Sequence, residues 1–290
     1  MKAVVVGAGA WGNAFAHLLR GRGHDVFVAG RAGLDDAPYE DAELVVLAVP
    51  SHAFREVLTH VRGRAPVLSL TKGLDPATGE RLSTLVRDRP VAVLSGPNMA
   101  EEVLAGLPGA TVIACEDEEL ALRLQHAVNS LVFRVYVNDD LVGVELCGAA
   151  KNVIALAAGG VDGLGLGDNA KAALITRGLV EMARLGEAFG AEPETFAGLA
   201  GMGDLMVTCF HPSGRNRRAG ELIARGATPE QARGEIGQAV EGLTTAPVLR
   251  ALSHRIGVEL PITEGVCAVL AGMPLHELAE NLMGRRPTEE

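Results

Sequence analysis

Lys151 is the residue of this sequence best suited to acid–base chemistry, because it interrupts a stretch that is otherwise almost wholly apolar. From residue 144 to residue 156 that stretch reads VELCGAAKNVIAL. A buried ammonium is costly unless it is paired, and burial moves its pKa toward neutrality. A lysine in that state can exchange a proton with a carbonyl or alcohol oxygen. Asn152 adds a second polar group to the same predicted helix, and a purely structural ion pair with Glu145 or Asp204 is the competing explanation.

Three further segments could bring polar groups to such a lysine. Lys72 follows a predicted strand at residues 67–71, and parallel sheets bind ligands beyond the carboxyl ends of their strands. The SGPN turn at residues 95–98 follows the next strand and could offer backbone amides. Asp204 is a lone acid in an apolar segment and therefore needs a partner, for which Lys151 is suited.

A phosphate site is predicted where a short basic run opens a helix. Residues 213–218 read SGRNRR, so the guanidinium fork of Arg215, the amide of Asn216 and a helix N-terminus would converge there. The alternative is a solvated helix start that binds nothing.

The chain begins with a strand and a glycine-rich turn of the kind that binds dinucleotides. Residues 3–12 read AVVVGAGAWG, and a helical stretch follows at residues 13–20. In this GxGxxG pattern Gly7 permits a tight turn, Gly9 lets the backbone approach a pyrophosphate, and Gly12 allows the helix to pack closely on the strand. The helix N-terminus adds free amides. We therefore predict nucleotide binding, with a merely structural turn as the alternative.

The end of the second predicted strand favours NADP(H), while NAD(H) stays compatible with the sequence. NAD-specific proteins carry an acid there for the ribose 2′-hydroxyl. Residues 26–31 read VFVAGR, so Arg31 stands where it could meet a 2′-phosphate. Asp35 and Asp36 follow closely, and Arg31 as a solvated loop charge is the alternative. Trp11 would either line the cofactor cleft or pack at the domain junction.

The order of the predicted elements indicates an α/β fold with an N-terminal Rossmann doubly wound parallel sheet and an all-helical C-terminal domain. The dinucleotide-binding domain would span residues 1–140, and the helical substrate-binding and catalytic domain residues 141–290. The predicted strands are 3–6, 25–29, 44–49, 67–71, 91–95, 111–114 and 133–137. In the second half, helices are predicted at 141–158, 170–189, 217–225, 229–238, 244–254 and 275–283.

Charge and composition argue against several classes of partner. The formal net charge of −10 disfavours nucleic acid as a partner. No uninterrupted apolar run approaches the roughly 18 residues that cross a membrane, and the first residues do not read as a signal peptide. We therefore expect a cytoplasmic protein that acts on a small molecule and does not insert into a membrane.

The four cysteines show neither CxxC spacing nor nearby histidine pairs. Buried free thiols in a reducing compartment are expected rather than disulfides or a metal site. The helical half is rich in Ala, Gly and Leu, which is compatible with a homodimer and equally with an internal core.

From end to end, the chain resembles the bacterial NAD(P)-dependent glycerol-3-phosphate dehydrogenases. The resemblance is carried by VELCGAAKN at 144–152, GLGDNAKAALITRG at 165–178, TKG at 71–73, SGP at 95–97, GDL at 203–205 and RNRR at 215–218. It implies reversible hydride transfer between NAD(P)H and dihydroxyacetone phosphate, which gives sn-glycerol 3-phosphate for glycerophospholipid synthesis.

The resemblance also implies roles for individual residues. Lys151 would accept the proton in alcohol oxidation and donate it in ketone reduction. The residues implied on the substrate are Lys72, Gly96, Asn98, Lys151, Asn152, Asp204, Gly214, Arg215 and Asn216. Those implied on the cofactor, beside Gly7, Gly9 and Gly12 of the loop, are Ala10, Trp11, Arg31, Lys72, Ala100, Arg215, Ala239 and Glu241.

The sequence departs from this family pattern at several places. Ala10 and Gly214 stand where serines are usual, and Asn98 replaces a serine or threonine, so side-chain contacts there are in doubt. The larger departure is the short path from Arg31 to the strand at Leu44, where relatives carry a longer stretch with a crossover helix. We expect a more open adenosine side of the cleft.

Two other functions compete with this interpretation. A β-hydroxyacid dehydrogenase also joins a Rossmann domain to helices with a catalytic lysine, but Arg215 and Lys72 favour a phosphorylated triose. A redox-sensing NADP-binding module would keep the glycine loop without needing the Lys151-Asn152 pair, and it would bind cofactor without turnover.

Overall fold

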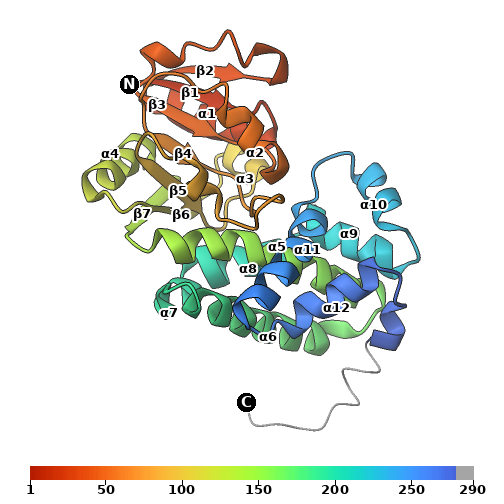
Figure 1. Ribbon diagram of the computed structural model, residues 1–290. Coiled ribbons are helices and arrows are strands. Elements are labelled where there is room, and N and C mark those ends of the chain that lie inside the picture. The colour runs from red at the N-terminus through yellow and green to blue at the C-terminus, as the bar shows by residue number, and fades with distance from the viewer. Residues whose placement is uncertain (279–290) are drawn as a thin grey trace.

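The structure, a computed structural model, describes residues 1–278. A sheet with its covering helices forms one part of the molecule and a bundle of helices the other, and helix α5 (Leu141–Gly163) runs along the boundary between them (Figure 1). The predicted combination of a Rossmann-like sheet with a helical C-terminal part is confirmed.

The sheet has seven strands in the order β2-β1-β3-β4-β5-β6-β7. The chain starts in β1, moves outward to β2, and returns to the other side of β1 with β3, which is the doubly wound arrangement. The strands are β1 (Lys2–Val6), β2 (Asp25–Ala29), β3 (Leu44–Leu47), β4 (Val67–Ser69), β5 (Val91–Ser95), β6 (Gly109–Ala114) and β7 (Phe133–Asn138).

The predicted doubly wound parallel sheet contains one antiparallel pair, because β6 runs antiparallel to β5. The segment between them, residues 96–108, contains only the five helical residues of α3 (Ala100–Leu104). This segment does not carry the chain back along the sheet, so β6 starts at the end of the sheet where β5 stops. The other strand pairs are parallel.

Both faces of the sheet are covered, as the continuous apolar strands predict. Side chains alternate between faces: Val5 packs with Phe15 of α1 (Ala10–Gly21), whereas Val4 packs with Phe54 of α2 (Ser51–Leu58). Helix α4 (Glu118–Val128) covers the same face as α1.

The connection from β2 to β3 contains no α-helix. Two short 3₁₀ turns, Arg31–Gly33 and Tyr39–Asp41, replace a crossover helix, and the ring of Tyr39 is buried against the α2 face of the sheet. This agrees with the short path noted in the sequence. A single aromatic side chain covers part of the face that a helix would otherwise protect.

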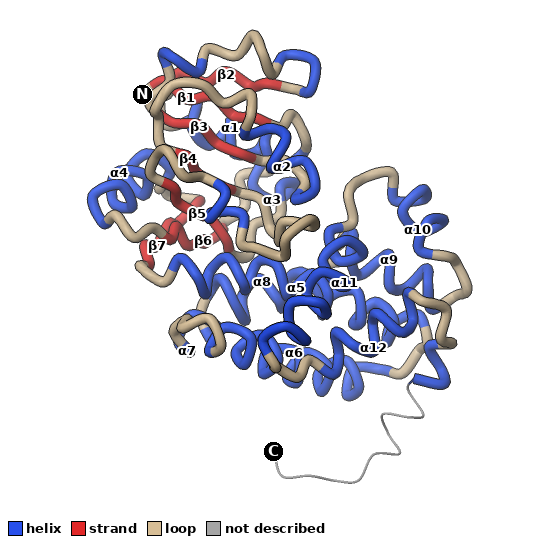
Figure 2. Tube along the Cα trace, viewed as in Figure 1, coloured by secondary structure: helices blue, strands red, loops and turns tan. Residues whose placement is uncertain are grey.

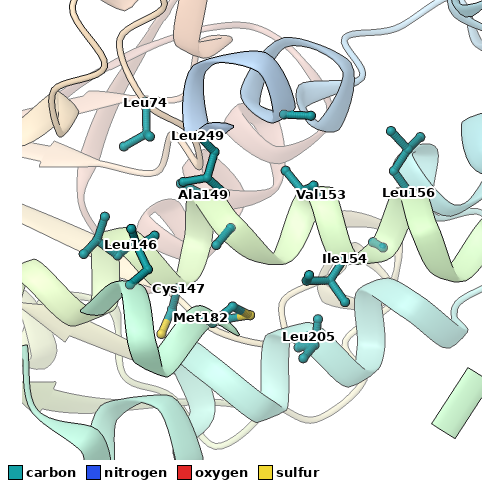
Figure 3. Packing of buried hydrophobic residues seen from close by; sticks show 14 of the residues in the cluster. Leu74, Leu146, Cys147, Ala149, Val153, Ile154, Leu156, Met182, Leu205 and Leu249 are labelled. Carbon is teal, nitrogen blue, oxygen red and sulfur yellow. The ribbon is translucent and has the colours of Figure 1, made fainter. Parts of the chain in front are cut away.

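Helix α5 starts where Asp140 caps it, with the carboxylate of Asp140 accepting from the backbone N–H of Gly143 at 2.7 Å. The helix is surrounded by other elements: Figure 3 shows Leu74 and Leu249 on one side of it and Met182 and Leu205 on the other. By length and composition α5 could cross a membrane, with mean hydropathy 1.6, but 89% of its most apolar window is buried inside the fold. Burial on all sides explains why its sequence is apolar without amphipathic periodicity.

The further helices of this part pack on α5, except α10, which packs on α9 (Figure 2). They are α6 (Gly167–Glu187), α7 (Pro193–Ala197), α8 (Asp204–Phe210), α9 (Arg215–Ala224), α10 (Pro229–Ile236), α11 (Glu241–Ile256) and α12 (Pro261–Leu270). Helices α7, α8 and α12 were not predicted. Of the helix predicted at 275–283, residues 275–278 are helical and 279–283 lie outside the described residues.

Candidate active site

Two lysines share one buried carboxylate at the junction of sheet and helices. Nζ of Lys151, on α5, lies 2.6 Å from Oδ1 of Asp204, and Nζ of Lys72, beyond the end of β4, lies 2.7 Å from Oδ2. Asp204 is the first residue of α8 and is only 2% exposed. Thr208, one turn later, accepts a hydrogen bond from Lys151 at 2.7 Å. The predicted contact between Lys151 and Asp204 is therefore present.

Burial and charge act against each other at this cluster. Burial lowers the pKa of Lys151 to about 8; the carboxylate of Asp204 opposes this shift, and the neighbouring ammonium of Lys72 adds to it. Burial also disfavours ionisation of Asp204, but the two lysines outweigh it and hold the pKa of Asp204 below its ordinary value. Asp204 thus stays charged while Lys151 titrates near neutrality, which suits proton exchange.

Lys72 connects the cluster to the turn after β5. Its Nζ atom donates to the carbonyl oxygen of Gly96 and to Oδ1 of Asn98, both at 3.1 Å. The amide of Asn98 donates to Thr111 on β6 at 3.2 Å, so the turn is tied to the neighbouring antiparallel strand. The structure therefore brings Lys72, Gly96 and Asn98 together as predicted.

Asn152 and Asn216 form a second polar group beside the lysines. Nδ2 of Asn152 donates to the carbonyl oxygen of Lys72 at 3.0 Å, and Oδ1 accepts from Nδ2 of Asn216 at 2.8 Å. Helix α9 reaches this position because it crosses α5 in backbone contact, where a Cβ atom at Gly220 would lie 1.9 Å from the carbonyl oxygen of Leu156. An amide has two donor hydrogens, and within residues 1–278 only one of those of Asn216 has an acceptor, so the other can serve a ligand.

Arg215 lies at the exposed start of α9, next to the buried Asn216. Its Nη1 atom donates to the carbonyl oxygen of Ala239 at 2.9 Å, and Gly214 stands at the N-cap without a capping side chain. The predicted phosphate-binding elements, a guanidinium, an amide and uncapped backbone N–H groups, are thus adjacent.

The glycine-rich loop has the geometry that a pyrophosphate requires. Gly7 has φ +114°, and a Cβ atom at Gly12 would lie 1.8 Å from the carbonyl oxygen of Gly7. At Gly9, by contrast, a Cβ atom would meet nothing within 4 Å, so the backbone faces open space. No side chain caps the N-terminus of α1, which leaves its first N–H groups for an anion. These residues fit a dinucleotide.

Other predicted cofactor residues are distributed around this loop. Arg31 is exposed just after β2, whose last residue, Ala29, accepts from the N–H of Gly7. Ala10 begins α1 and Ala100 begins α3. Trp11 packs on Phe15 and Phe133, with ring centroids 6.1 and 6.5 Å away, and its buried Nε1 atom has no hydrogen-bond partner in the described residues.

Glu241, at the start of α11, contacts the sheet part of the molecule. It accepts hydrogen bonds from the N–H and the hydroxyl of Ser51 at the start of α2, at 3.1 and 2.5 Å. Ser51 was not predicted from the sequence, although it follows the carboxyl end of β3, where ligands of such sheets bind.

Glu145 is not the partner of Lys151. Its carboxylate accepts from the N–H of Ser83 at 2.8 Å and from the hydroxyl of Ser83 at 2.6 Å, and it pairs with Arg81 at 3.2 Å. Thr208 was also missed, although its position four residues after Asp204 on one helix face was a usable signal. Within the described residues 1–278, no three metal-ligating side chains gather as a metal site.

Two family models match the chain. Residues 32–121 match the NAD-dependent glycerol-3-phosphate dehydrogenase N-terminus, and residues 140–279 match the C-terminus of the same family. A glycerol-3-phosphate dehydrogenase [NAD(P)+] of Klebsiella pneumoniae is 42% identical, over 99% of this chain and 96% of the relative. A Salmonella newport protein of the same name is also 42% identical, with the same coverage.

Solved structures agree with these sequence matches. The crystal structure of a glycerol-3-phosphate dehydrogenase from Coxiella burnetii has a TM-score of 0.91 at 36% identity, covering 98% of this chain and 99% of that one. A ketopantoate reductase from Ralstonia eutropha reaches only 0.59 at 16% identity, over 96% of this chain and 100% of that one, and shares the fold alone.

Proposed function

The chain belongs to the NAD-dependent glycerol-3-phosphate dehydrogenase family, and from this premise we propose how its residues divide the work of catalysis. The protein is an oxidoreductase that uses NAD(P)H to reduce dihydroxyacetone phosphate reversibly to sn-glycerol 3-phosphate, in keeping with a role in glycerophospholipid synthesis. The observation that carries the residue roles is the Lys151–Asp204–Lys72 cluster at the boundary of sheet and helices.

Lys151 is the acid–base group. Its ammonium donates a proton to the carbonyl oxygen in ketone reduction, and the neutral amine takes the proton back in alcohol oxidation. The hydrogen bonds to Asp204 and Thr208 hold Nζ in one place, and the pKa of about 8 supplies both protonation states near neutral pH. Lys72 keeps a second positive charge beside the reacting oxygen, which favours developing negative charge there.

The phosphate of the substrate lies at the start of α9 in this proposal. Arg215 contributes a guanidinium, Asn216 its free amide N–H, and Gly214 the backbone of an uncapped helix start. Asn152 fixes Asn216 and Lys72 relative to each other through its hydrogen bonds to both. Gly96 and Asn98 hold the Lys72 ammonium. Positioning of this kind supplies much of the rate enhancement in two-substrate reactions.

The cofactor is held by the loop of Gly7, Gly9 and Gly12, with the pyrophosphate on the N-terminus of α1. Arg31 meets the 2′-phosphate of NADP(H), which makes NADP(H) the preferred form, and NAD(H) is also used. When bound, the nicotinamide supplies or accepts the hydride. Ala10, Trp11, Ala100, Ala239, Glu241, Lys72 and Arg215 complete the proposed contacts.

We propose that residues 1–140 form the dinucleotide-binding domain and residues 141–290 the substrate-binding and catalytic domain. In support, Asp140 caps α5 directly after β7 ends at Asn138. We also propose a cytoplasmic protein that does not insert into membranes, since its four cysteines are free and buried and its most apolar helix is buried in the fold.

We propose further that the chain forms a homodimer through an apolar groove of about 490 Å³ between α5, α6, α9 and α12. One copy of α6 would contact α6 of a second copy, because α6 and its preceding residue line the groove at the 3–4 residue spacing typical of helix pairs: Leu166, Ala170, Ala173, Arg177, Val180 and Arg184. Light scattering should report a dimer for the wild type and a monomer for Val180→Glu. Leu122→Glu, at an apolar residue of α4 that is at least as exposed, should leave the dimer intact.

The test of the enzymatic proposal is oxidation of NADPH and of NADH with dihydroxyacetone phosphate as the substrate. Turnover is expected with both cofactors, and faster with NADPH at low concentration. Ketopantoate and short β-hydroxyacids serve as competing substrates. Binding of NADPH without turnover on dihydroxyacetone phosphate would contradict the assignment of the site.

A further inference from the structure

Three hydrogen bonds lead from the Lys72 turn through the helical half of the chain. The carbonyl oxygen of Lys72 accepts from Asn152, Asn152 accepts from Asn216, and Oδ1 of Asn216 accepts from the backbone N–H of Gly242 at 2.9 Å. Gly242 is the second residue of α11. The side chains that face the substrate are therefore connected to the N-terminus of that helix.

The residue before Gly242 is Glu241, which contacts the sheet part of the molecule. Both of its carboxylate oxygens accept hydrogen bonds from Ser51, whose side chain is buried. Gly73, next to Lys72, lies against this pair: a Cβ atom there would be 2.7 Å from Cβ of Ser51 and 3.1 Å from Oε2 of Glu241. These contacts form a closed ring that starts and ends at the Lys72-Gly73 turn. Its other members are Asn152, Asn216, the start of α11 and Ser51.

The contact between Ser51 and Glu241 has the features of a strong one. The hydroxyl-to-carboxylate distance of 2.5 Å is that of a charge-assisted hydrogen bond, and the carboxylate sits at the positive end of α2. An ionised carboxylate has about four lone-pair sites, and Ser51 occupies two of them. Glu241 therefore retains acceptor sites for a ligand while Ser51 holds it in place.

We propose that Ser51 is a positioning residue for the bound cofactor, which acts by holding the Glu241 carboxylate and, through it, the N-terminus of α11 against the Lys72-Gly73 turn. This rests on the proposed role of Glu241 as a cofactor contact. Gly73 is required because a Cβ atom there would lie 2.7 Å from Cβ of Ser51, so Ser51 or the turn would have to shift.

The molecule contains a matched control. Ser83 donates its N–H and hydroxyl to Glu145, a carboxylate from the helical half, at 2.8 and 2.6 Å. As at Ser51, one buried serine donates both groups to one carboxylate, and here Arg81 is an additional partner of that carboxylate. Among the described residues, the Ser83 pair makes no hydrogen bond to Ser51 or Glu241; its connection to the Lys72-Gly73 turn runs only through Arg81, whose backbone pairs with Leu74. Ser83→Ala should therefore reproduce the stability cost of Ser51→Ala without its effect on the cofactor.

The experiment measures the Kd of NADPH from the fluorescence of Trp11, the only tryptophan, together with KM and kcat for the complete enzyme. Ser51→Ala should raise the Kd and KM for NADPH about tenfold and leave kcat at saturating substrates within about threefold, as expected for loss of one hydrogen bond to a charged group. Gly73→Ala should weaken NADPH binding similarly.

A double-mutant cycle of Ser51→Ala and Glu241→Ala tests whether Ser51 affects NADPH binding through Glu241 or independently of it. If Ser51 acts through Glu241, the double variant Ser51→Ala/Glu241→Ala should bind NADPH no more weakly than Glu241→Ala alone. Additive losses, tighter binding by Ser51→Ala, or an equal effect of Ser83→Ala would each overturn the inference. Unchanged NADPH affinity in Glu241→Ala would instead refute the proposed cofactor contact itself.

Discussion

The Nζ atom of Lys151 lies 2.6 Å from Oδ1 of Asp204, and both side chains are almost fully buried. The carboxylate is not neutralised by Lys151 alone, because its other oxygen holds Lys72. One buried negative charge therefore faces two positive ones, and the less solvated of the two lysines has its pKa lowered to about 8. Burial therefore outweighs the opposing charge of Asp204 and lets Lys151 lose its proton near physiological pH.

Lys151→Ala should lower kcat for dihydroxyacetone phosphate reduction by about 10²- to 10⁴-fold, the usual contribution of a general acid. Affinity for NADPH, measured by Trp11 fluorescence, should change little. Lys171→Ala is the control, because Lys171 is equally buried and pairs with Asp162 rather than with Asp204. Comparable losses of turnover in the two variants would mean that Lys151 is needed only for stability.

The two reaction directions should respond oppositely to pH around the pKa of Lys151. Reduction needs the ammonium, so its kcat should fall as pH rises through about 8, whereas oxidation needs the free amine and should rise. Because the Asp204 charge raises the pKa of Lys151, Asp204→Asn should shift both midpoints to lower pH. Midpoints that stay in place in this variant would assign the titration to another group.

Replacement by alanine should affect cofactor binding at Gly9 and protein stability at Gly12. Gly9 has φ −75° and open space around its Cβ position, so Gly9→Ala should keep the melting temperature and weaken NADPH binding where the pyrophosphate approaches. At Gly12 the added methyl group would lie 1.8 Å from the carbonyl oxygen of Gly7. Gly12→Ala should therefore lower stability by about 1–3 kcal/mol. Thermal melts and Kd measurements on both variants check the contrast.

Arg31→Ala should weaken binding of NADPH about tenfold and leave NADH binding unchanged, because only NADPH offers a 2′-phosphate to the guanidinium. The ratio of kcat/KM for the two cofactors is the direct measurement. Higher salt should reduce the wild-type preference, since Arg31 is exposed and its interaction is screened. Equal losses for both cofactors would place Arg31 elsewhere on the dinucleotide.

Glu181 should make stability depend on pH in the acidic range. Burial raises its pKa to about 7, even though the N–H groups of Ile262 and Thr263 at the start of α12 donate to it. The folded state then keeps a proton that the unfolded state releases near pH 4.5, so this residue lowers stability as pH rises from 4.5 to 7.

Urea unfolding as a function of pH tests this dependence. The difference in stability between Glu181→Gln and wild type should grow in favour of the variant over that range, by at most about 1.4 kcal/mol per pH unit. Glu187→Gln, at an exposed position of the same helix, should show no such trend. A constant difference across the range would contradict the assignment.

The sequence by itself determined the features whose cause is local. A GxGxxG turn after an apolar strand identifies the start of a doubly wound fold, because only glycine fits the backbone of Gly7 and the close packing at Gly12. A lysine within an apolar helix marks Lys151 as a group with a displaced pKa. The resemblance to a dehydrogenase family could be stated on such motifs, and the family models confirm it.

The tertiary structure decided what depends on segments far apart in the chain. The sequence offered both Glu145 and Asp204 as partners for Lys151, and only the packing shows that Glu145 accepts hydrogen bonds from Ser83 instead. The direction of β6 could likewise not be predicted from the sequence. Nor could the contact of Ser51 with Glu241, since these residues are separated by most of the chain. A hydrogen bond needs its two atoms within about 3 Å, and no local pattern of residue types encodes that distance.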